Sequence, residues 1–560
     1  MKPTSVFSKP VIVLIIISFL GIQVWAKDPV RAKNGMVVTS DKIATEVGVR
    51  ILRKGGNAVD AAVAVGFALA VTYPYAGNLG GGGFMVIHTS SGKDITIDFR
   101  EKAPLSASRN MYLDKEGNVI PEMSRFGWSS AGVPGTVAGL IMALEKYGTM
   151  KLKDVIEPAI ELAENGFPVT YKFAESVNAY NADFNKFESS KKIFTRGGEF
   201  IKENELFVQK DLAHTLRLIQ EEGAEGFYEG EVARLISEQS KEYGGFISLN
   251  DLKDYKPVER EPVKGNFRGY EIVSMPPPAS GGVCIIEALN IIENYNISKE
   301  EWGSSKYIKI LADALKYVYY DRAKYLGDPD FVKMPLERLL SKEFGREIYR
   351  KIEEKQFPHE TFKNEYESNE TTHYSVADSK GNAVSTTYTI NSAFGSKVVV
   401  EGAGFLMNNE MDDFSAKPGV PNQFQLIGSE ANSIQPGKRM LSSMSPVIVL
   451  KEGKPYLITG SPGGSTIITS VLQVILNVLE FGMNVRDAVE MPRIHHQYLP
   501  DMIDYERFGM TMDVKNNLVK DGEKIGEIKK LGIVESILID NEGIFWGAAD
   551  PRGTGIAKGL

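Results

Sequence analysis

Cysteine and histidine are scarce in this 560-residue sequence, which has one cysteine, Cys284, and six histidines. A single cysteine excludes an internal disulfide bond and any metal site made of several cysteines. The histidines include no His-Glu-x-x-His motif, the usual signature of a zinc-dependent protease. The sequence therefore points away from disulfide-stabilised folds and from metal catalysis, and we expect neither a metal nor a cofactor.

Basic residues are not in excess either, since 64 Lys and Arg stand against 72 Asp and Glu, a net charge of −8. Proteins that bind nucleic acids usually carry a basic surplus that neutralises phosphates. The glycine-rich run at 78–84 lacks the Gly-Lys-Ser/Thr ending of a phosphate-binding loop, and no Gly-x-Ser-x-Gly elbow occurs. These absences argue against a nucleic-acid partner, nucleotide hydrolysis and a Ser-His-Asp triad.

Apolar runs long enough to cross a bilayer are absent, and near the N-terminus residues 11–22 are almost all hydrophobic. Lys2 and Lys9 precede this run and Ala26 follows it, which is the pattern of a signal peptide cleaved after Ala26. An uncleaved membrane anchor is the alternative, although the run is shorter than the roughly 20 residues that span a bilayer. We predict a signal peptide over residues 1–26 and an exported protein, periplasmic or secreted, with no membrane association after its removal.

The overall composition, with 43% hydrophobic and 24% charged residues, is that of a folded globular protein. Apolar patterning predicts helices over residues 41–53, 59–72 and 466–481, and short β-like runs predict strands at 84–88 and 95–99. Helical and extended segments alternate along the chain. The length fits either one large unit of mixed α and β structure or several smaller domains.

The clearest change in composition lies between residues 370 and 371. Residues 351–370 are polar and contain too few apolar side chains to pack unaided. Thr371 then begins two strand-like segments, 371–378 and 382–390. They flank a three-residue turn that ends in Gly381, which suits the left-handed position of such a turn, so the sequence predicts a β-hairpin.

The register of this hairpin brings polar side chains together. A turn over residues 379–381 places Thr371 opposite Thr389, and Asn391 lies two positions further along the same face. The alternative interpretation is an edge hairpin that contains threonines because threonine favours strands. We expect His373, inside the hairpin, to pack rather than to catalyse.

Four further segments contain polar groups of interest for binding or catalysis. Gly463 and Gly464 precede an apolar helix, where backbone N–H groups can hold an oxyanion. Arg100 ends a short strand and can bind a carboxylate with two hydrogen bonds. The acidic segment 408–415 is suited to binding an ammonium group, and a serine pair, Ser442 and Ser443, lies within residues 436–446. Each feature also has a plainer explanation as a turn, a surface ion pair or a solvated loop.

Together these motifs resemble the γ-glutamyltranspeptidase (glutathione hydrolase) family. The resemblance includes the segments 98–101, 132–139 and 550–552 and runs from about Ala32 to Arg552. It implies an α+β fold of the N-terminal-nucleophile hydrolase type, a four-layered αββα sandwich built from both subunits after self-cleavage.

The resemblance also implies how the chain is processed. Cleavage is expected between Glu370 and Thr371, which gives a large subunit of residues 27–370 and a small catalytic subunit of residues 371–560. The two fragments are expected to remain together as a heterodimer. An internal threonine hydroxyl has no base beside it, whereas a freed α-amino group, with an ordinary pKa of roughly 7.7–8.0, can accept its proton.

The implied reaction moves a γ-glutamyl group from glutathione or another γ-glutamyl donor to water, or to an amino-acid or dipeptide acceptor. The resemblance makes Thr371 the nucleophile and Thr389 the residue that orients it. The oxyanion would be held by Gly463 and Gly464. The implied binding residues are Arg100, Ser442 and Ser443 for the donor α-carboxylate, and Asn391, Glu410 and Asp413 for its α-ammonium group.

Two departures from the pattern concern the donor pocket. Residues 414–434 resemble the lid loop of bacterial members, and Phe424 stands where these commonly have tyrosine, so a hydroxyl that could close the lid is missing. Glu410 stands where some members have glutamine, and its added negative charge favours an ammonium group.

Two other functions remain open. One is an acylase of the same fold that acts on glutaryl amides of cephalosporins, and the other is a non-catalytic exported scaffold. Asp413 argues against the first because a glutaryl group has no ammonium to pair with it. The second requires a damaged site, and none of the expected groups is missing.

Overall fold

The computed structural model describes residues 28–358, 371–420, 422–423 and 425–560, which are organised around two seven-stranded sheets. In order across the first sheet, the strands are β19 (Ile556–Gly559), β2 (Gly35–Thr39), β10 (Thr372–Asp378), β11 (Ala383–Thr389), β3 (Gly82–His88), β4 (Asp94–Asp98) and β7 (Val258–Arg260). In the second they are β1 (Val30–Ala32), β18 (Phe545–Ala549), β17 (Glu535–Ile539), β13 (Lys454–Thr459), β12 (Val447–Lys451), β9 (Tyr270–Ser274) and β8 (Val263–Phe267). Two small sheets consist of β14 (Ile494–His495), β15 (Ile503–Tyr505) and β16 (Ile525–Ile528), and of β5 (Phe167–Pro168) and β6 (Leu206–Phe207).

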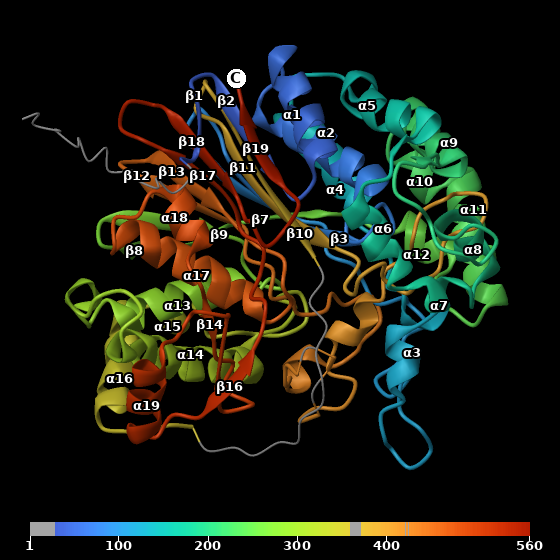
Figure 1. Cartoon of the computed structure of the whole chain (residues 1–560). Coiled ribbons are helices and arrows are strands. Elements are labelled where there is room, and N and C mark those ends of the chain that lie inside the picture. The colour runs from blue at the N-terminus through green and yellow to red at the C-terminus, as the bar shows by residue number, and fades with distance from the viewer. Residues whose placement is uncertain (1–27, 359–370, 421, 424) are drawn as a thin grey trace, which may run out of the picture.

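The helices fall into groups on either side of the sheets (Figure 1). Those of the N-terminal half are α1 (Lys42–Arg53), α2 (Ala58–Thr72), α3 (Pro121–Arg125), α4 (Thr136–Tyr147), α5 (Leu152–Asn165), α6 (Tyr171–Asn178), α7 (Asn181–Phe184), α8 (Glu188–Phe194), α9 (Lys210–Glu222), α10 (Glu225–Tyr228), α11 (Gly230–Glu242) and α12 (Leu249–Lys253). Those that follow are α13 (Gly281–Ile292), α14 (Ser305–Tyr325), α15 (Leu336–Leu339), α16 (Lys342–Glu353), α17 (Thr466–Leu479), α18 (Val485–Glu490) and α19 (Met512–Lys520).

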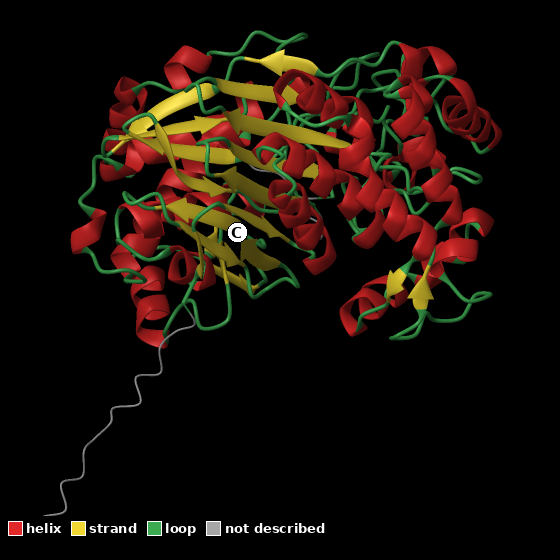
Figure 2. Cartoon of the chain, turned by 90° about the horizontal axis from the view of Figure 1, so that it is seen from above, coloured by secondary structure: helices red, strands yellow, loops and turns green. Residues whose placement is uncertain are grey.

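The two large sheets stack face to face, and helices cover both outer faces (Figure 2). Helices α1, α2 and α4 pack on the first sheet, whereas α13 and α18 pack on the second. Alternate residues of one strand face opposite layers, so Phe84 and Val86 of β3 join the core between the sheets while Met85 and Ile87 join the core under α2. This is the four-layered αββα sandwich that the sequence predicted.

The predicted local elements are confirmed with small shifts at their ends. Helix α1 begins after Asp41, whose side chain accepts a hydrogen bond from the Ala44 N–H, as expected of a helix cap. Helix α2 is buried along its whole length, which explains why its residues are almost all apolar. No helix in the described ranges is long and apolar enough to cross a membrane.

The hairpin at residue 371 has the predicted register but not an edge position. Thr372 pairs with Tyr388, and Gly381 adopts a φ of 93° in the turn. Strand β10 pairs with β2 on its other side, and β11 pairs with β3. The edge-hairpin interpretation is therefore wrong, because strands about 300 residues earlier in the chain flank the hairpin on both sides. Glu370 and Phe424 lie outside the described residues.

Candidate active site

Thr371 stands at the head of β10 with its hydroxyl directed toward β11. Its Oγ1 is hydrogen-bonded to Thr389 Oγ1 at 3.3 Å, and both residues are buried. Thr389 Oγ1 also accepts a hydrogen bond from the Asn391 N–H at 2.8 Å. Asn391 has a φ of 75°, the left-handed conformation that asparagine tolerates, and this turn brings its amide back to the threonine. The three residues converge as the register predicted.

Gly463 and Gly464 form a tight turn immediately before α17. Both have positive φ, 135° and 53°, and a Cβ at Gly463 would lie 2.6 Å from Thr466 Oγ1. Glycine is therefore required for this turn. Neither N–H donates a hydrogen bond to another described residue. Two backbone donors beside the Thr371 hydroxyl, with no acceptor among the described residues, are suited to an oxyanion.

A small pocket of about 20 Å³ opens beside the Thr371 hydroxyl. Its lining includes nine of the ten residues predicted to act in catalysis or donor binding: Arg100, Thr371, Thr389, Asn391, Glu410, Asp413, Ser442, Ser443 and Gly464. The tenth, Gly463, lines an adjoining larger cavity that Thr371 also borders. A space of this size holds about one water molecule, so a ligand must displace the contacts that now fill it.

Arg100 is the central charge of this pocket and is fully buried. Its Nη2 lies 2.5 Å from Asp413 Oδ2, and its Nη1 contacts the Glu410 carboxylate. A third acid, Glu101, has an oxygen 3.6 Å from Arg100 Nη1. Burial raises the pKa of Glu410 and of Asp413, and the Arg100 charge offsets part of this effect. Burial also raises the pKa of Glu101 to about 8.

The serine pair lies at one end of the pocket on a loop held by backbone hydrogen bonds. The Ser442 N–H donates to the Pro278 carbonyl at 2.8 Å, and Ser443 Oγ accepts a hydrogen bond from Arg322 of α14 at 3.1 Å. Arg322 was not among the predicted site residues. Nothing in its sequence context, Tyr-Tyr-Asp-Arg within a helix, distinguishes it from a surface arginine.

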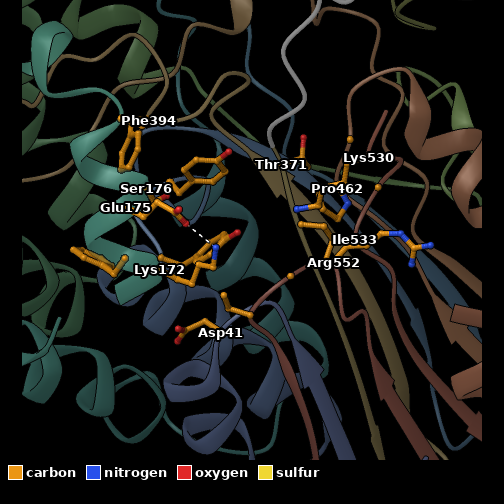
Figure 3. A pocket seen from close by; sticks show the side chains of 18 of the residues that line it. Asp41, Lys172, Glu175, Ser176, Thr371, Phe394, Pro462, Lys530, Ile533 and Arg552 are labelled. Carbon is orange, nitrogen blue, oxygen red and sulfur yellow. Dashed lines mark hydrogen bonds and ion pairs between the residues drawn. The ribbon is translucent and has the colours of Figure 1, made fainter. Parts of the chain in front are cut away.

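The larger cavity has a volume of about 900 Å³ and lies on the other side of Thr371. Figure 3 shows Thr371, Pro462, Lys530, Ile533 and Arg552 along one side of it, and Lys172, Glu175, Ser176 and Phe394 along the other. Lys172 is hydrogen-bonded to Glu175 at 2.7 Å across the surface of α6. A single hydroxyl, that of Thr371, therefore borders both a small charged pocket and a roomy cavity.

His373 takes no part in this arrangement. It is buried between Thr387 Oγ1, at 2.8 Å from its Nδ1, and Ser375 Oγ, at 3.1 Å from its Nε2. Burial lowers the pKa of His373 to about 3, so the ring is neutral at physiological pH. As expected, it packs within the sandwich.

Comparisons with known proteins agree with this geometry. A family model described as gamma-glutamyltranspeptidase matches residues 44–560. The glutathione hydrolase proenzyme of Escherichia coli (strain K12) is 49% identical over 530 residues, which cover 94% of this chain and 91% of that protein.

Two solved structures are also similar to this chain. The γ-glutamyltranspeptidase of Helicobacter pylori is 50% identical with a TM-score of 0.56, over 57% of this chain and 92% of that one. The cephalosporin acylase of Bacillus halodurans is 28% identical with a TM-score of 0.85, over 100% and 99% of the two chains. The chain belongs to the γ-glutamyltranspeptidase family and has the N-terminal-nucleophile hydrolase fold.

Proposed function

We propose that the chain is an exported, self-processing enzyme in which Thr371 carries γ-glutamyl groups from a donor to water or to an amine. The observation that carries the proposal is the charge pattern of the pocket beside Thr371. One buried guanidinium and two buried carboxylates, those of Arg100, Glu410 and Asp413, lie within reach of one another. This pattern complements the α-carboxylate and α-ammonium of a γ-glutamyl group.

The binding step exchanges one set of ion pairs for another. In the structure Arg100 is paired with Glu410 and Asp413. A zwitterionic head inserts between them, so that its carboxylate faces Arg100, Ser442 and Ser443. Its ammonium then faces the two acids and the Asn391 side chain. Each buried charge keeps an opposite partner throughout, which limits the desolvation cost.

Cleavage of the Glu370–Thr371 bond supplies the base. The new α-amino group lies on the nucleophilic residue itself and takes the proton of the Thr371 hydroxyl. The oxygen attacks the γ-carbonyl carbon, and the negative charge on the carbonyl oxygen is held by the N–H groups of Gly463 and Gly464. The leaving amine receives the proton as its bond to carbon breaks, which leaves an ester at Thr371. Water or an acceptor amine then attacks the ester carbonyl and gives a proton to the α-amino group. The bond to the Thr371 oxygen breaks, the oxygen recovers that proton, and glutamate or the new γ-glutamyl amide is released.

The two fragments, residues 27–370 and 371–560, stay associated because both sheets contain strands from each. In the first sheet β10 and β11 lie between β2 and β3 and are hydrogen-bonded to both. Cleavage before Thr371 leaves these strand pairings intact. The product is a heterodimer of the chain's own fragments.

The larger cavity is suited to the rest of the donor and to the acceptor. With about 900 Å³ it has room for the cysteinylglycine part of glutathione and for amino acids or dipeptides. Thr371 and Gly463 on its border place an incoming amine next to the ester carbonyl.

A glutaryl acylase is the second candidate and fits the pocket less well. A glutaryl group offers a carboxylate to Arg100 but no cation to Glu410 and Asp413. Both acids would then be buried beside a bound anion, which costs free energy. The acids therefore favour a donor with an α-ammonium group.

Intact-mass analysis and N-terminal sequencing of protein from the exporting cell test the proposal, beside a Thr371→Ala variant. We expect two fragments, one of which begins Thr-Thr-His-Tyr, cleavage of γ-glutamyl-p-nitroanilide much faster than of glutaryl-p-nitroanilide, and one uncut chain in the variant. A large fragment that begins at Lys27 would confirm signal removal. An uncut chain in both samples would overturn the self-processing mechanism.

A further inference from the structure

Arg322, near the end of α14, is a buried cation that forms no ion pair with any described residue. Its Nε donates a hydrogen bond to Ser280 Oγ at 2.9 Å, and its Nη2 donates to Ser443 Oγ at 3.1 Å. Two hydroxyls do not replace the hydration that a guanidinium loses on burial. Burial accordingly lowers the pKa of Arg322. A negative charge that binds near this group is therefore favoured.

The contacts of Arg322 lead to both serines of the donor pocket. Ser280 Oγ donates to the Ser442 carbonyl oxygen at 2.6 Å, and the Ser280 N–H donates to the same oxygen at 2.7 Å. Ser443 accepts a hydrogen bond from Arg322 itself. Because the guanidinium N–H occupies a lone pair of Ser443 Oγ, the hydroxyl hydrogen is left to donate to another acceptor.

The charges around Arg100 show why a second cation matters. Arg100 alone faces three acids, Glu101, Glu410 and Asp413. When these acids are ionised, their combined charge opposes a carboxylate that approaches Arg100. Arg322 places a second positive charge behind the serines. It interacts electrostatically with Asp413 but forms no ion pair with a described acid, so this end of the pocket becomes the one suited to an anion.

We propose that Arg322 is a positioning residue, which orients the Ser442–Ser443 pair and adds positive charge for the donor α-carboxylate. The inference rests on the proposed function, which places that carboxylate at the two serines. Arg322 should therefore affect binding of the donor α-carboxylate and not binding of its α-ammonium group.

Two inhibitors separate that effect from a general structural one. L-Glutamate has both an α-carboxylate and an ammonium group, and 4-aminobutyrate is the same molecule without the α-carboxylate. Their inhibition constants are measured against γ-glutamyl-p-nitroanilide with fully processed wild-type, Arg322→Gln and Arg322→Lys enzymes. In Arg322→Gln we expect the constant for glutamate to rise by about tenfold or more and that for 4-aminobutyrate to change less than about twofold.

The lysine variant keeps the charge but cannot reach two hydroxyls with a planar fork, so we expect a smaller rise for glutamate. Ser280→Ala keeps Arg322 and removes the hydroxyl that links it to the Ser442 carbonyl, and it carries the test if Arg322→Gln is not processed. Arg217→Gln, which removes an arginine paired with Glu157 and Glu164 on the far helices, is the matched control.

A rise confined to glutamate supports the assignment. Equal rises for both inhibitors, or an unchanged constant for glutamate, overturn it. Failure of the wild-type enzyme to cleave the anilide would instead refute the proposed function, so the two failures are distinguishable.

Discussion

The hydroxyl oxygens of Thr371 and Thr389 lie 3.3 Å apart where the start of β10 meets the end of the antiparallel strand β11, although 18 positions separate the residues in the sequence. This contact defines the orientation of the proposed nucleophile. The Asn391 N–H fixes the second threonine in turn. Thr371 is therefore positioned by a short chain of hydrogen bonds that ends in the backbone.

Removal of the Thr389 hydroxyl should slow the chemical step. We expect Thr389→Ala to lower kcat for γ-glutamyl-p-nitroanilide by about 10- to 100-fold with little change in KM, because a misdirected nucleophile loses reactivity rather than substrate affinity. Thr386→Val, on the opposite face of the same strand, is the control and should retain kcat. Equal losses in both variants would show that the strand, not the hydroxyl, is responsible.

Neutralisation of Asp413 should alter donor selectivity. Asp413→Asn keeps the shape of the side chain but removes a charge that would pair with the α-ammonium, so we expect the ratio of kcat/KM for γ-glutamyl over glutaryl anilide to fall by about 100-fold. Asp412→Asn is the control, since its carboxylate accepts hydrogen bonds from Ser124 and the Gln423 N–H. A ratio that is unchanged in Asp413→Asn would contradict the assigned role.

A side chain at Gly463 should disturb the oxyanion site. The added Cβ would meet Thr466 Oγ1 at 2.6 Å in a backbone conformation that favours glycine, so the turn must shift. For Gly463→Ala we expect kcat to fall by about 100-fold, as for the loss of one oxyanion donor, with KM nearly constant. Gly482→Ala, also at positive φ but with open space around the Cβ, should lose stability and not kcat.

The buried Glu101 carboxyl should make the enzyme less stable as the pH rises. Its pKa is raised from 4.5 to about 8, so the folded protein holds a proton there that the unfolded chain releases near pH 4.5. The stabilisation is complete below about pH 4.5 and is lost as the pH rises toward 8.

Melting temperatures measured from pH 5 to 8 check this prediction. We expect Glu101→Gln, which is neutral at every pH, to flatten the decline that the wild-type protein shows. Glu122→Gln, at an exposed position, should reproduce the wild-type decline. A wild-type profile that rises over this range would contradict the proposed protonation of Glu101.

The features that could be predicted from the sequence are those set by local geometry. The turn over residues 379–381 fixes the pairing of the strands on either side of it, so the approach of Thr371 to Thr389 follows from counting residues. The capping of α1 by Asp41 and the burial of α2 follow from residue type in the same way.

Features that depend on distant packing could not be predicted in this way. Arg322 contacts Ser443 across 121 positions only because α14 packs behind the loop that contains the serines. The position of the hairpin in the middle of the first sheet also depends on distant packing, because the flanking strands β2 and β3 lie near the other end of the chain. Nine of the ten residues predicted from the family resemblance line one pocket. The individual motifs did not predict this grouping, because each also had a plainer explanation.

The insertion of β10 and β11 between β2 and β3 has a consequence for the life of the molecule. Neither fragment contains all the strands of either seven-stranded sheet, so the uncut chain alone has the connectivity needed to reach this arrangement. With the proposed cleavage before Thr371, the native state would be preserved by the barrier to unfolding, because separated fragments would have to associate and pair their strands again. A chain cleaved as proposed would therefore unfold slowly but would not refold once its fragments had separated.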